Sequence, residues 1–446
     1  MAGLAEPKLE LPGRVGTTLP SAARARLLPL LGKGTLALSD QALFSGANFL
    51  VNMLLARRLA PHDYGAYSLA YAWFLLFAAL HQALLIEPMM IFGSGKYFDR
   101  FHRYVMLLIG CHAALLVPAG IMLWLISAAF GSDLGGARPA FQGMALASSL
   151  ILLFWLMRRV FYVLSKPAWG VISSLLYFLA LAAALGILVV FHRLTPQTGF
   201  LAMAAGGALV SSILLWKLRT LSGVGGPSPS FAQVASDHWR YGRWSLASAL
   251  ASWFPSNIYY VLLSTWLGLE GPAALRALTN FIMPATQGVM ALNMLMLPAL
   301  VRDRRHGTRK MNQTMALFLV LLGGGCAIYL SALWLFRDHL FQLFYGGRYT
   351  QYRGGPLLLA GALPIGTCLY SAIGNGLRAL ERPDRMFWAF IGSSAAAVVF
   401  GIPLTARFGV TGALLGNHCS AIVFIAMLAW LYRSLSRRPG QAAKEG

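Results

Sequence analysis

Long apolar runs constrain this chain more than any other feature. Runs of about 20 residues, each long enough to cross a bilayer as a helix, recur from residue 35 to residue 432. In hydrocarbon every backbone N–H and C=O needs a partner within the protein, so each run must be helical. We therefore predict an all-α polytopic membrane protein with about twelve transmembrane helices. We place the spans at 35–57, 65–91, 104–129, 140–163, 168–191, 198–217, 243–267, 274–300, 312–336, 354–376, 386–405 and 410–432.

The basic residues are distributed unevenly between the two sides of the membrane. A formal net charge of +22 raises the question of nucleic-acid binding. If the N-terminus is cytoplasmic, however, the tails and even-numbered loops carry 27 of the 36 Lys and Arg residues. This positive-inside bias predicts that both termini are cytoplasmic. The most basic loop, 302–310, then lies against anionic lipid head groups, and we expect no nucleic-acid partner.

The longest cytoplasmic loop, 218–242, divides the spans into two sets of six. It opens with a Gly/Ser/Pro-rich stretch and continues with amphipathic Phe231–Trp244, a pattern typical of a linker with an interfacial helix. Short matches, such as Leu164–Pro167 with Leu380–Pro383, recur in order between the sets and indicate a duplicated bundle. Because six is even, the copies share an orientation and should be related by an axis along the membrane normal. The predicted segments are a cytoplasmic tail 1–34, a six-helix bundle 35–217, the linker 218–242, a second bundle 243–432 and a cytoplasmic tail 433–446.

Polar side chains follow helical spacing within several spans. Arg276, Asn280 and Gln287 share a face of the eighth span, and Asn48 and Asn52 share a face of the first. A single Asn or Ser often only ties helices together, whereas a buried Arg usually lines a water-filled path. The candidate substrate-binding residues are Asn48, Asn52, Arg57, Arg58, Arg276, Asn280, Gln287, Asn375 and Arg378.

Two carboxylates, Asp40 and Glu87, lie within predicted spans. Either could carry a coupling proton or sodium ion by changing its protonation with the conformational state. Either could instead pair with a neighbouring Arg or lie at the head-group level, and the sequence leaves both alternatives open. We find no catalytic constellation, metal-ligand spacing or cofactor motif, and we expect a protein that is not an enzyme.

The connection between the first two spans resembles a known family. Leu54–Ala70, LLARRLAPHDYGAYSLA, combines a Leu-rich span end, a Pro-acidic-Tyr-Gly turn and a second span that opens with Tyr, Ser and Leu. This hairpin resembles the opening of bacterial polysaccharide flippases of the multidrug/oligosaccharidyl-lipid/polysaccharide exporter superfamily. The position of Arg276 and the layout of residues 35–435 are similar as well.

This resemblance implies two six-helix bundles with alternating access in a bacterial inner membrane. The implied cargo is an undecaprenyl-diphosphate-linked oligosaccharide, moved to the periplasmic face for O-antigen (lipopolysaccharide) or exopolysaccharide synthesis. Arg57, Arg58, Arg276 and Arg378 would attract the diphosphate, and Asn and Gln side chains would contact sugars. The implied partners are membrane lipids, a polysaccharide polymerase and chain-length machinery.

Two alternatives remain beside the flippase. A cation-coupled multidrug antiporter of the same superfamily should have an acidic, aromatic cavity. The basic residues of this chain instead favour a phosphate cargo. A membrane-embedded glycosyltransferase or polymerase should have acidic residues and a sizeable outer loop, and the predicted outer loops are short.

Overall fold

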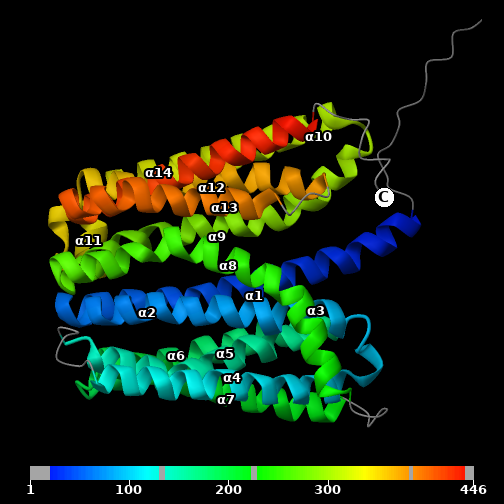
Figure 1. The fold of residues 1–446 in the computed structure, drawn as a ribbon, viewed down its shortest axis with the longest axis horizontal. Helices are drawn as coiled ribbons and strands as arrows, with labels where there is room; N and C mark the ends of the chain where they lie inside the picture. The colour runs from blue at the N-terminus through cyan, green and yellow to red at the C-terminus, as the bar shows by residue number, and fades with distance from the viewer. Residues whose placement is uncertain (1–20, 130–135, 222–228, 381–384, 437–446) are drawn as a thin grey trace, which may run out of the picture.

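A computed structural model describes residues 21–129, 136–221, 229–380 and 385–436. These residues form helices joined by short turns, which confirms the predicted all-α polytopic class (Figure 1). Several predicted features lie outside the described residues. They are positions 1–20 and 437–446 of the two tails, 222–228 of the linker, and Glu381, Arg382 and Pro383 of the second repeat motif.

The first half of the chain contains seven long or medium helices. Proline opens α2, α6 and α7, where its missing N–H would have no helical partner in any case. The second span is broken by the π-helix η1, so α2, η1 and α3 together make one crossing. The elements are α1 (Ser21–Arg58), α2 (Pro61–His81), η1 (Gln82–Ile86), α3 (Glu87–Gly93), η2 (Phe98–Arg100), α4 (Phe101–Ala129), α5 (Arg138–Val163), α6 (Pro167–Val190) and α7 (Pro196–Leu221).

The second half begins with the 37-residue helix α8. Near the end of the second half, Gly409 interrupts α14, and the chain reverses direction there. Its φ of +56° is a left-handed conformation that glycine adopts without a Cβ penalty. The elements are α8 (Phe231–Leu267), α9 (Glu270–Arg304), α10 (Thr308–Leu335), α11 (Arg337–Tyr345), η3 (Thr350–Tyr352), α12 (Gly355–Ala379), α13 (Arg385–Ala396), η4 (Ala397–Gly401) and α14 (Ile402–Ser436).

Nine helical stretches of the described chain are long and apolar enough to cross a membrane. One of them, Met386–Ser434, contains the reversal at Gly409 and therefore accounts for two crossings. The helices α1 and α8 are long enough to cross but carry more polar residues, and both lie in the middle of the bundle (Figure 1). The arrangement agrees with about twelve crossings of about 20 residues each.

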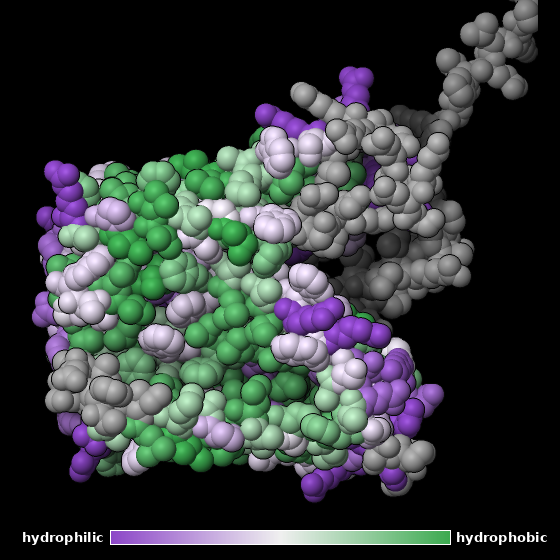
Figure 2. Space-filling view, in the orientation of Figure 1, coloured by the Kyte–Doolittle hydropathy of each residue, from purple (hydrophilic) through white to green (hydrophobic). Residues whose placement is uncertain are grey.

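The two halves of the chain lie on opposite sides of the molecule, with α1, α2, α8 and α9 between their outer layers (Figure 1). Following the predicted topology, we call the end that carries α11 the outer end and the opposite end the inner end. Figure 2 shows a hydrophobic band around the middle, polar side chains at both ends and a hollow between the halves at the inner end. Apolar side chains in the band are highly exposed, for example Ile328 at 74% and Val320 at 71%, as expected of a surface that faces lipid.

Candidate functional site

The two halves touch closely at the outer end. Helix α2 of the first half packs against α8 and α9 of the second half, and α1 packs against α9 and α11. A Cβ atom on Gly65 would lie only 1.6 Å from the carbonyl oxygen of Leu269, so the two backbones are in direct contact there. Any side chain at Gly65 would push the halves apart.

Polar side chains reinforce this outer contact. Asn280 Nδ2 donates to the hydroxyl of Tyr64 at 2.8 Å, across the two halves. The guanidinium of Arg57 donates to the carbonyl of Leu343 in α11, and Arg348 donates in return to the carbonyl of Leu59 beyond the end of α1. Arg57 therefore binds the opposite half of the protein in this conformation.

Arg276 lies within the outer contact and is nine-tenths buried. Its guanidinium carbon is 4.9 Å from the ring centre of Tyr71 in the first half and 4.5 Å from that of Tyr260 in the second half. Its Nε and Nη2 atoms are buried and find no hydrogen-bond partner among the described residues. Rings from both halves thus hold a cation that has no nearby counter-ion in the described chain.

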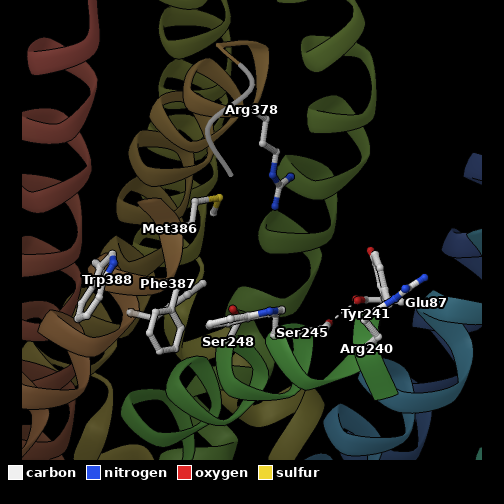
Figure 3. Close-up of a pocket in the computed structure, with 11 residues that line it drawn as sticks. Glu87, Arg240, Tyr241, Ser245, Ser248, Arg378, Met386, Phe387 and Trp388 are labelled. Carbon is white, nitrogen blue, oxygen red and sulfur yellow. Dashed lines mark hydrogen bonds between the residues drawn. The ribbon is translucent and has the colours of Figure 1, made fainter. Parts of the chain in front are cut away.

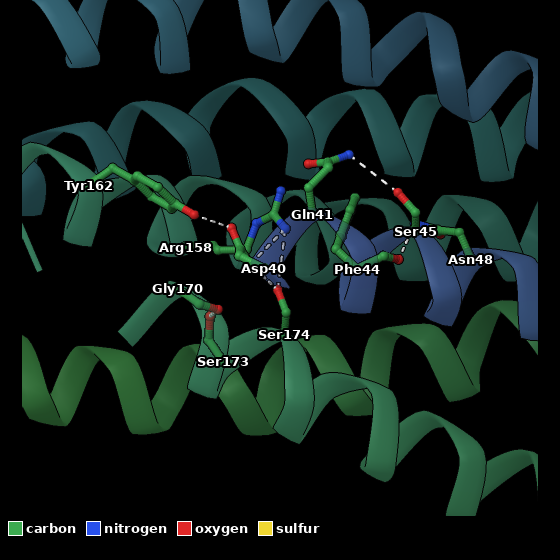
Figure 4. A network of polar contacts seen from close by, with 10 residues as sticks. All are labelled: Asp40, Gln41, Phe44, Ser45, Asn48, Arg158, Tyr162, Gly170, Ser173 and Ser174. Atoms are coloured by element: carbon green, nitrogen blue, oxygen red, sulfur yellow. Dashed lines mark hydrogen bonds and ion pairs between the residues drawn. The ribbon is translucent and has the colours of Figure 1, made fainter. Parts of the chain in front are cut away.

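Asp40 is buried in a polar network inside the first half (Figure 4). Its Oδ1 atom lies 3.1 Å from Nη1 of Arg158 and accepts a hydrogen bond from Ser174, and Tyr162 donates to Oδ2 at 2.5 Å. Arg158 also lies over the ring of Phe44. Of the roles left open for Asp40, this conformation shows the pairing with a neighbouring Arg. To carry a coupling ion, Asp40 would have to exchange Arg158 for it.

A cavity of about 770 Å³ opens at the inner end (Figure 3). Its walls come from α3, α8, α12 and α13, so both halves of the chain contribute. Arg378 points into it from the end of α12, and the carboxylate of Glu87 accepts a hydrogen bond from Ser245 of α8. The lining residues are Glu87, Arg240, Tyr241, Trp244, Ser245, Ser248, Arg378, Met386, Phe387, Trp388 and Phe390.

The side chain of Arg378 is supported by a short amide chain. Its Nη1 atom lies 3.5 Å from Oδ1 of Asn375, whose Nδ2 lies 3.4 Å from Oδ1 of Asn293 in α9. This places Asn375 beneath the arginine at the inner end. Of the predicted residues, Arg378 and Glu87 therefore line the same cavity, and Asn375 contacts Arg378.

Other predicted site residues lie elsewhere. Asn48 and Asn52 donate to the carbonyls of Phe44 and Asn48, one turn earlier in their own helix. Gln287 is partly buried in α9, and Arg58 is exposed at the end of α1. The predicted set is thus divided among the outer contact, the inner cavity and positions within α1 and α9 that belong to neither.

Sequence reasoning missed the aromatic partners of Arg276 and the basic residue Arg240. Tyr64, Tyr67 and Tyr71 follow helical spacing in the second span, which could have indicated an aromatic face. Arg240 lies in the predicted amphipathic stretch, where nothing in the sequence distinguishes it from the other basic residues of the linker. Only the packing of α8 across the first half brings it to the cavity.

No family model matches the chain. It is 26% identical over 364 residues to the EPS I polysaccharide export inner membrane protein EpsE of Ralstonia nicotianae, covering 74% of this chain and 77% of the relative. A MATE family transporter of the MOP superfamily in an inward-facing conformation superposes with a TM-score of 0.71 at 14% identity, covering 91% of this chain and all of that one. The lipid II flippase MurJ, in an inward closed conformation, superposes with a TM-score of 0.66 at 13% identity, covering 93% of this chain and 90% of that one.

The chain has the MOP superfamily fold. The resemblance to polysaccharide exporters of this superfamily, predicted from the hairpin Leu54–Ala70, is confirmed by the relative. The halves are in contact at the end that carries α11, and the cavity opens at the opposite end. If the predicted topology holds, this is an inward-facing arrangement.

Proposed function

We propose that this protein is a flippase of the bacterial inner membrane. It moves an undecaprenyl-diphosphate-linked oligosaccharide from the cytoplasmic to the periplasmic face by alternating access, in O-antigen or exopolysaccharide synthesis. The relative named for polysaccharide export and the fold shared with a lipid II flippase support this proposal. The observation that carries it is the inner cavity, which combines arginines with an aromatic wall.

The cavity chemistry suits an anionic amphiphile. Arg240 and Arg378 contribute two positive charges against the single carboxylate of Glu87. A guanidinium can pair two phosphate oxygens with parallel hydrogen bonds, which fits a diphosphate better than an ammonium does. Ser245 and Ser248 add hydroxyl groups that can meet sugar hydroxyls.

Glu87 is the better placed of the two proposed coupling residues. It lines the cavity, where a proton or sodium ion from the cytoplasm can reach it. Asp40 is buried against Arg158 and would need a rearrangement first. The MOP fold also houses multidrug transporters, so cation-coupled drug export is the competing function. The excess of arginine over carboxylate in the cavity counts against a cationic drug.

The test is transport with purified protein in proteoliposomes. Removing the charge in Arg378→Gln should weaken cargo binding by about 1.5–3 kcal/mol, the usual contribution of a charged hydrogen bond. That corresponds to about tenfold to hundredfold in affinity. Arg309→Gln, an exposed arginine outside the cavity, is the matched control and should transport normally. Export of a cationic dye that depends on Glu87, without translocation of lipid-linked sugar, would instead establish the antiporter.

A further inference from the structure

Helix α8 is fixed at its start to the opposite half of the protein. Asp237 accepts hydrogen bonds from Lys96 Nζ and Tyr97 Oη, both at 2.6 Å. Burial alone would raise the pKa of Asp237, but these two hydrogen bonds and the charges of Lys96 and Arg240 hold it below its ordinary value. The carboxylate is therefore charged and tied to the first half at neutral pH.

His238 makes the second attachment of α8 to the first half. Its Nδ1 atom lies 2.8 Å from the carbonyl of Leu84 in the π-helix η1. A Cβ on Gly242 would lie 2.9 Å from the carbonyl of Ala83 in the same π-helix, so α8 packs tightly on the break in the second span. The start of α8 thus moves with the first half.

Farther along, α8 is joined to α13 of its own half. Pro255 has no N–H, so the carbonyl of Ala251 one turn earlier loses its helical donor. Ser394 of α13 donates to this carbonyl at 2.7 Å. Helix α8 is therefore held to the first half at Asp237 and to α13 at Ala251.

On the inner side of the Ala251–Ser394 hydrogen bond, the inner cavity lies between α8 and α13. Every α8 residue that lines the inner cavity precedes Ala251, and every α13 residue that lines it precedes Ser394. The cavity thus lies on the inner side of the hydrogen bond between them, and we call it the wedge. Among its lining residues Trp244 is 65% exposed and Trp388 is 59% exposed, so the wedge reaches the surface of the bundle.

The wedge has an apolar side and a polar side (Figure 3). Met386, Phe387 and Trp388 from α13 form one apolar wall. Trp244 of α8 lines the same cavity. Arg240 lies next to Glu87 on the other side, and Arg378 reaches the cavity from the end of α12, apart from these two residues. In a cavity with an aromatic wall and two guanidinium groups, the apolar tail of an anionic lipid can contact the rings while its phosphates bind the guanidinium groups.

We propose that the wedge between α8 and α13 is a lateral portal for the polyprenyl tail of the cargo. The diphosphate binds Arg378 and Arg240 inside, and the first isoprene units lie against Phe387 and Trp388 while the remaining tail stays in the bilayer. This inference rests on the proposed function and adds where the lipid is held. Keeping the tail in hydrocarbon avoids the large cost of exposing it to water during transfer.

The experiment is site-specific photo-crosslinking of the full-length protein in lipid nanodiscs. A benzophenone amino acid replaces Trp388 in the portal or, as the matched control, Trp430, a 68% exposed tryptophan of α14 that does not line the cavity. The probe is tritiated undecaprenyl diphosphate. We expect crosslinking at position 388 that unlabelled undecaprenyl diphosphate abolishes and excess phosphatidylglycerol does not, with little crosslinking at position 430.

Binding measurements separate the portal from the proposed function. Trp388→Ala should weaken binding of the probe by about tenfold, whereas Trp430→Ala should not change it. If the probe binds and Arg378→Gln weakens it, but position 388 crosslinks no better than position 430, the portal is wrong and the flippase proposal stands. Equal crosslinking at both positions that no competitor reduces would mean bulk lipid contact and would also reject the portal. If the probe does not bind at all, the proposed function itself fails.

Discussion

Arg276 combines two roles that its position makes compatible. In this conformation its guanidinium lies between Tyr71 and Tyr260, which belong to opposite halves. A desolvated cation–π contact contributes about 2 kcal/mol or more, so Arg276 stabilises the closed outer end. When the outer end opens, Tyr71 must part from Tyr260, and the guanidinium then needs another partner. An anionic cargo can supply it.

We predict that Arg276→Ala abolishes polysaccharide export while the protein still inserts into the membrane. Arg276→Lys should restore export only in part, because an ammonium cannot reproduce the planar fork of a guanidinium. Complementation of an export-deficient strain, with membrane abundance measured in parallel, checks both. Full export by a well-expressed Arg276→Ala variant would leave phosphate binding to Arg378.

The pair formed by Asp40 and Arg158 makes a prediction about stability. Both side chains are almost fully buried, and removing one partner of such a pair typically costs about 3–5 kcal/mol because the other charge is left unpaired. We expect Asp40→Asn to lower the thermal stability of the purified protein more than the double variant Asp40→Asn/Arg158→Met. A double-mutant cycle on melting temperatures measures the coupling. Two results together would instead favour ion coupling by Asp40. The losses in melting temperature of the two single variants would be additive, and transport by Asp40→Asn would no longer depend on the coupling ion.

At the scale of elements, the spans could be predicted and their breaks could not. Apolar length sets where helices cross, and Pro167 and Pro196 mark helix starts by their missing N–H. Nothing local in Gln82–Ile86 predicts a π-helix. The residue that contacts the carbonyl of Leu84 within it, His238, lies far along the chain. The split of the predicted site has the same origin. A sequence places Arg276 and Arg378 on polar helix faces, but only the packing of the two halves shows which end is closed.

Gly65 of α2 should act as the spacer that lets the outer end close. Gly65→Ala puts a methyl group where the carbonyl of Leu269 lies, so the halves must separate. We expect a longer and broader distance distribution between spin labels at His62 and Gln351, measured by double electron–electron resonance. Gly110→Ala, at a helical glycine with open space around it, is the control and should leave the distances unchanged. Unchanged distances in Gly65→Ala would show that the backbone around Leu269 adjusts locally and that the two halves stay together.

At the scale of the whole molecule, the uneven distribution of Lys and Arg predicts the orientation in the membrane. Both termini and the loop 302–310 should be cytoplasmic, which puts the inner cavity on the side where lipid-linked sugars are assembled. A cysteine at Arg309 in a cysteine-free background should react with a membrane-impermeant maleimide only after the cells are permeabilised. Labelling in intact cells would reverse the topology and, with it, the direction of transport.

The last prediction concerns alternating access itself. If the halves must part at the outer end to release cargo, a covalent bridge across that end should stop export. Tyr64 and Asn280 touch across the halves, whereas Tyr432 and Asn312 make the same kind of contact within the second half. Replacing either pair by cysteines in a cysteine-free background, and bridging it with a bifunctional methanethiosulfonate, therefore gives matched variants. We expect the bridge at 64 and 280 to stop export until a reductant cleaves it, and the bridge at 432 and 312 to leave export intact. Undiminished export with the first bridge fully formed would mean that the outer end need not open, and a rocking exchange between two half-bundles would have to be abandoned.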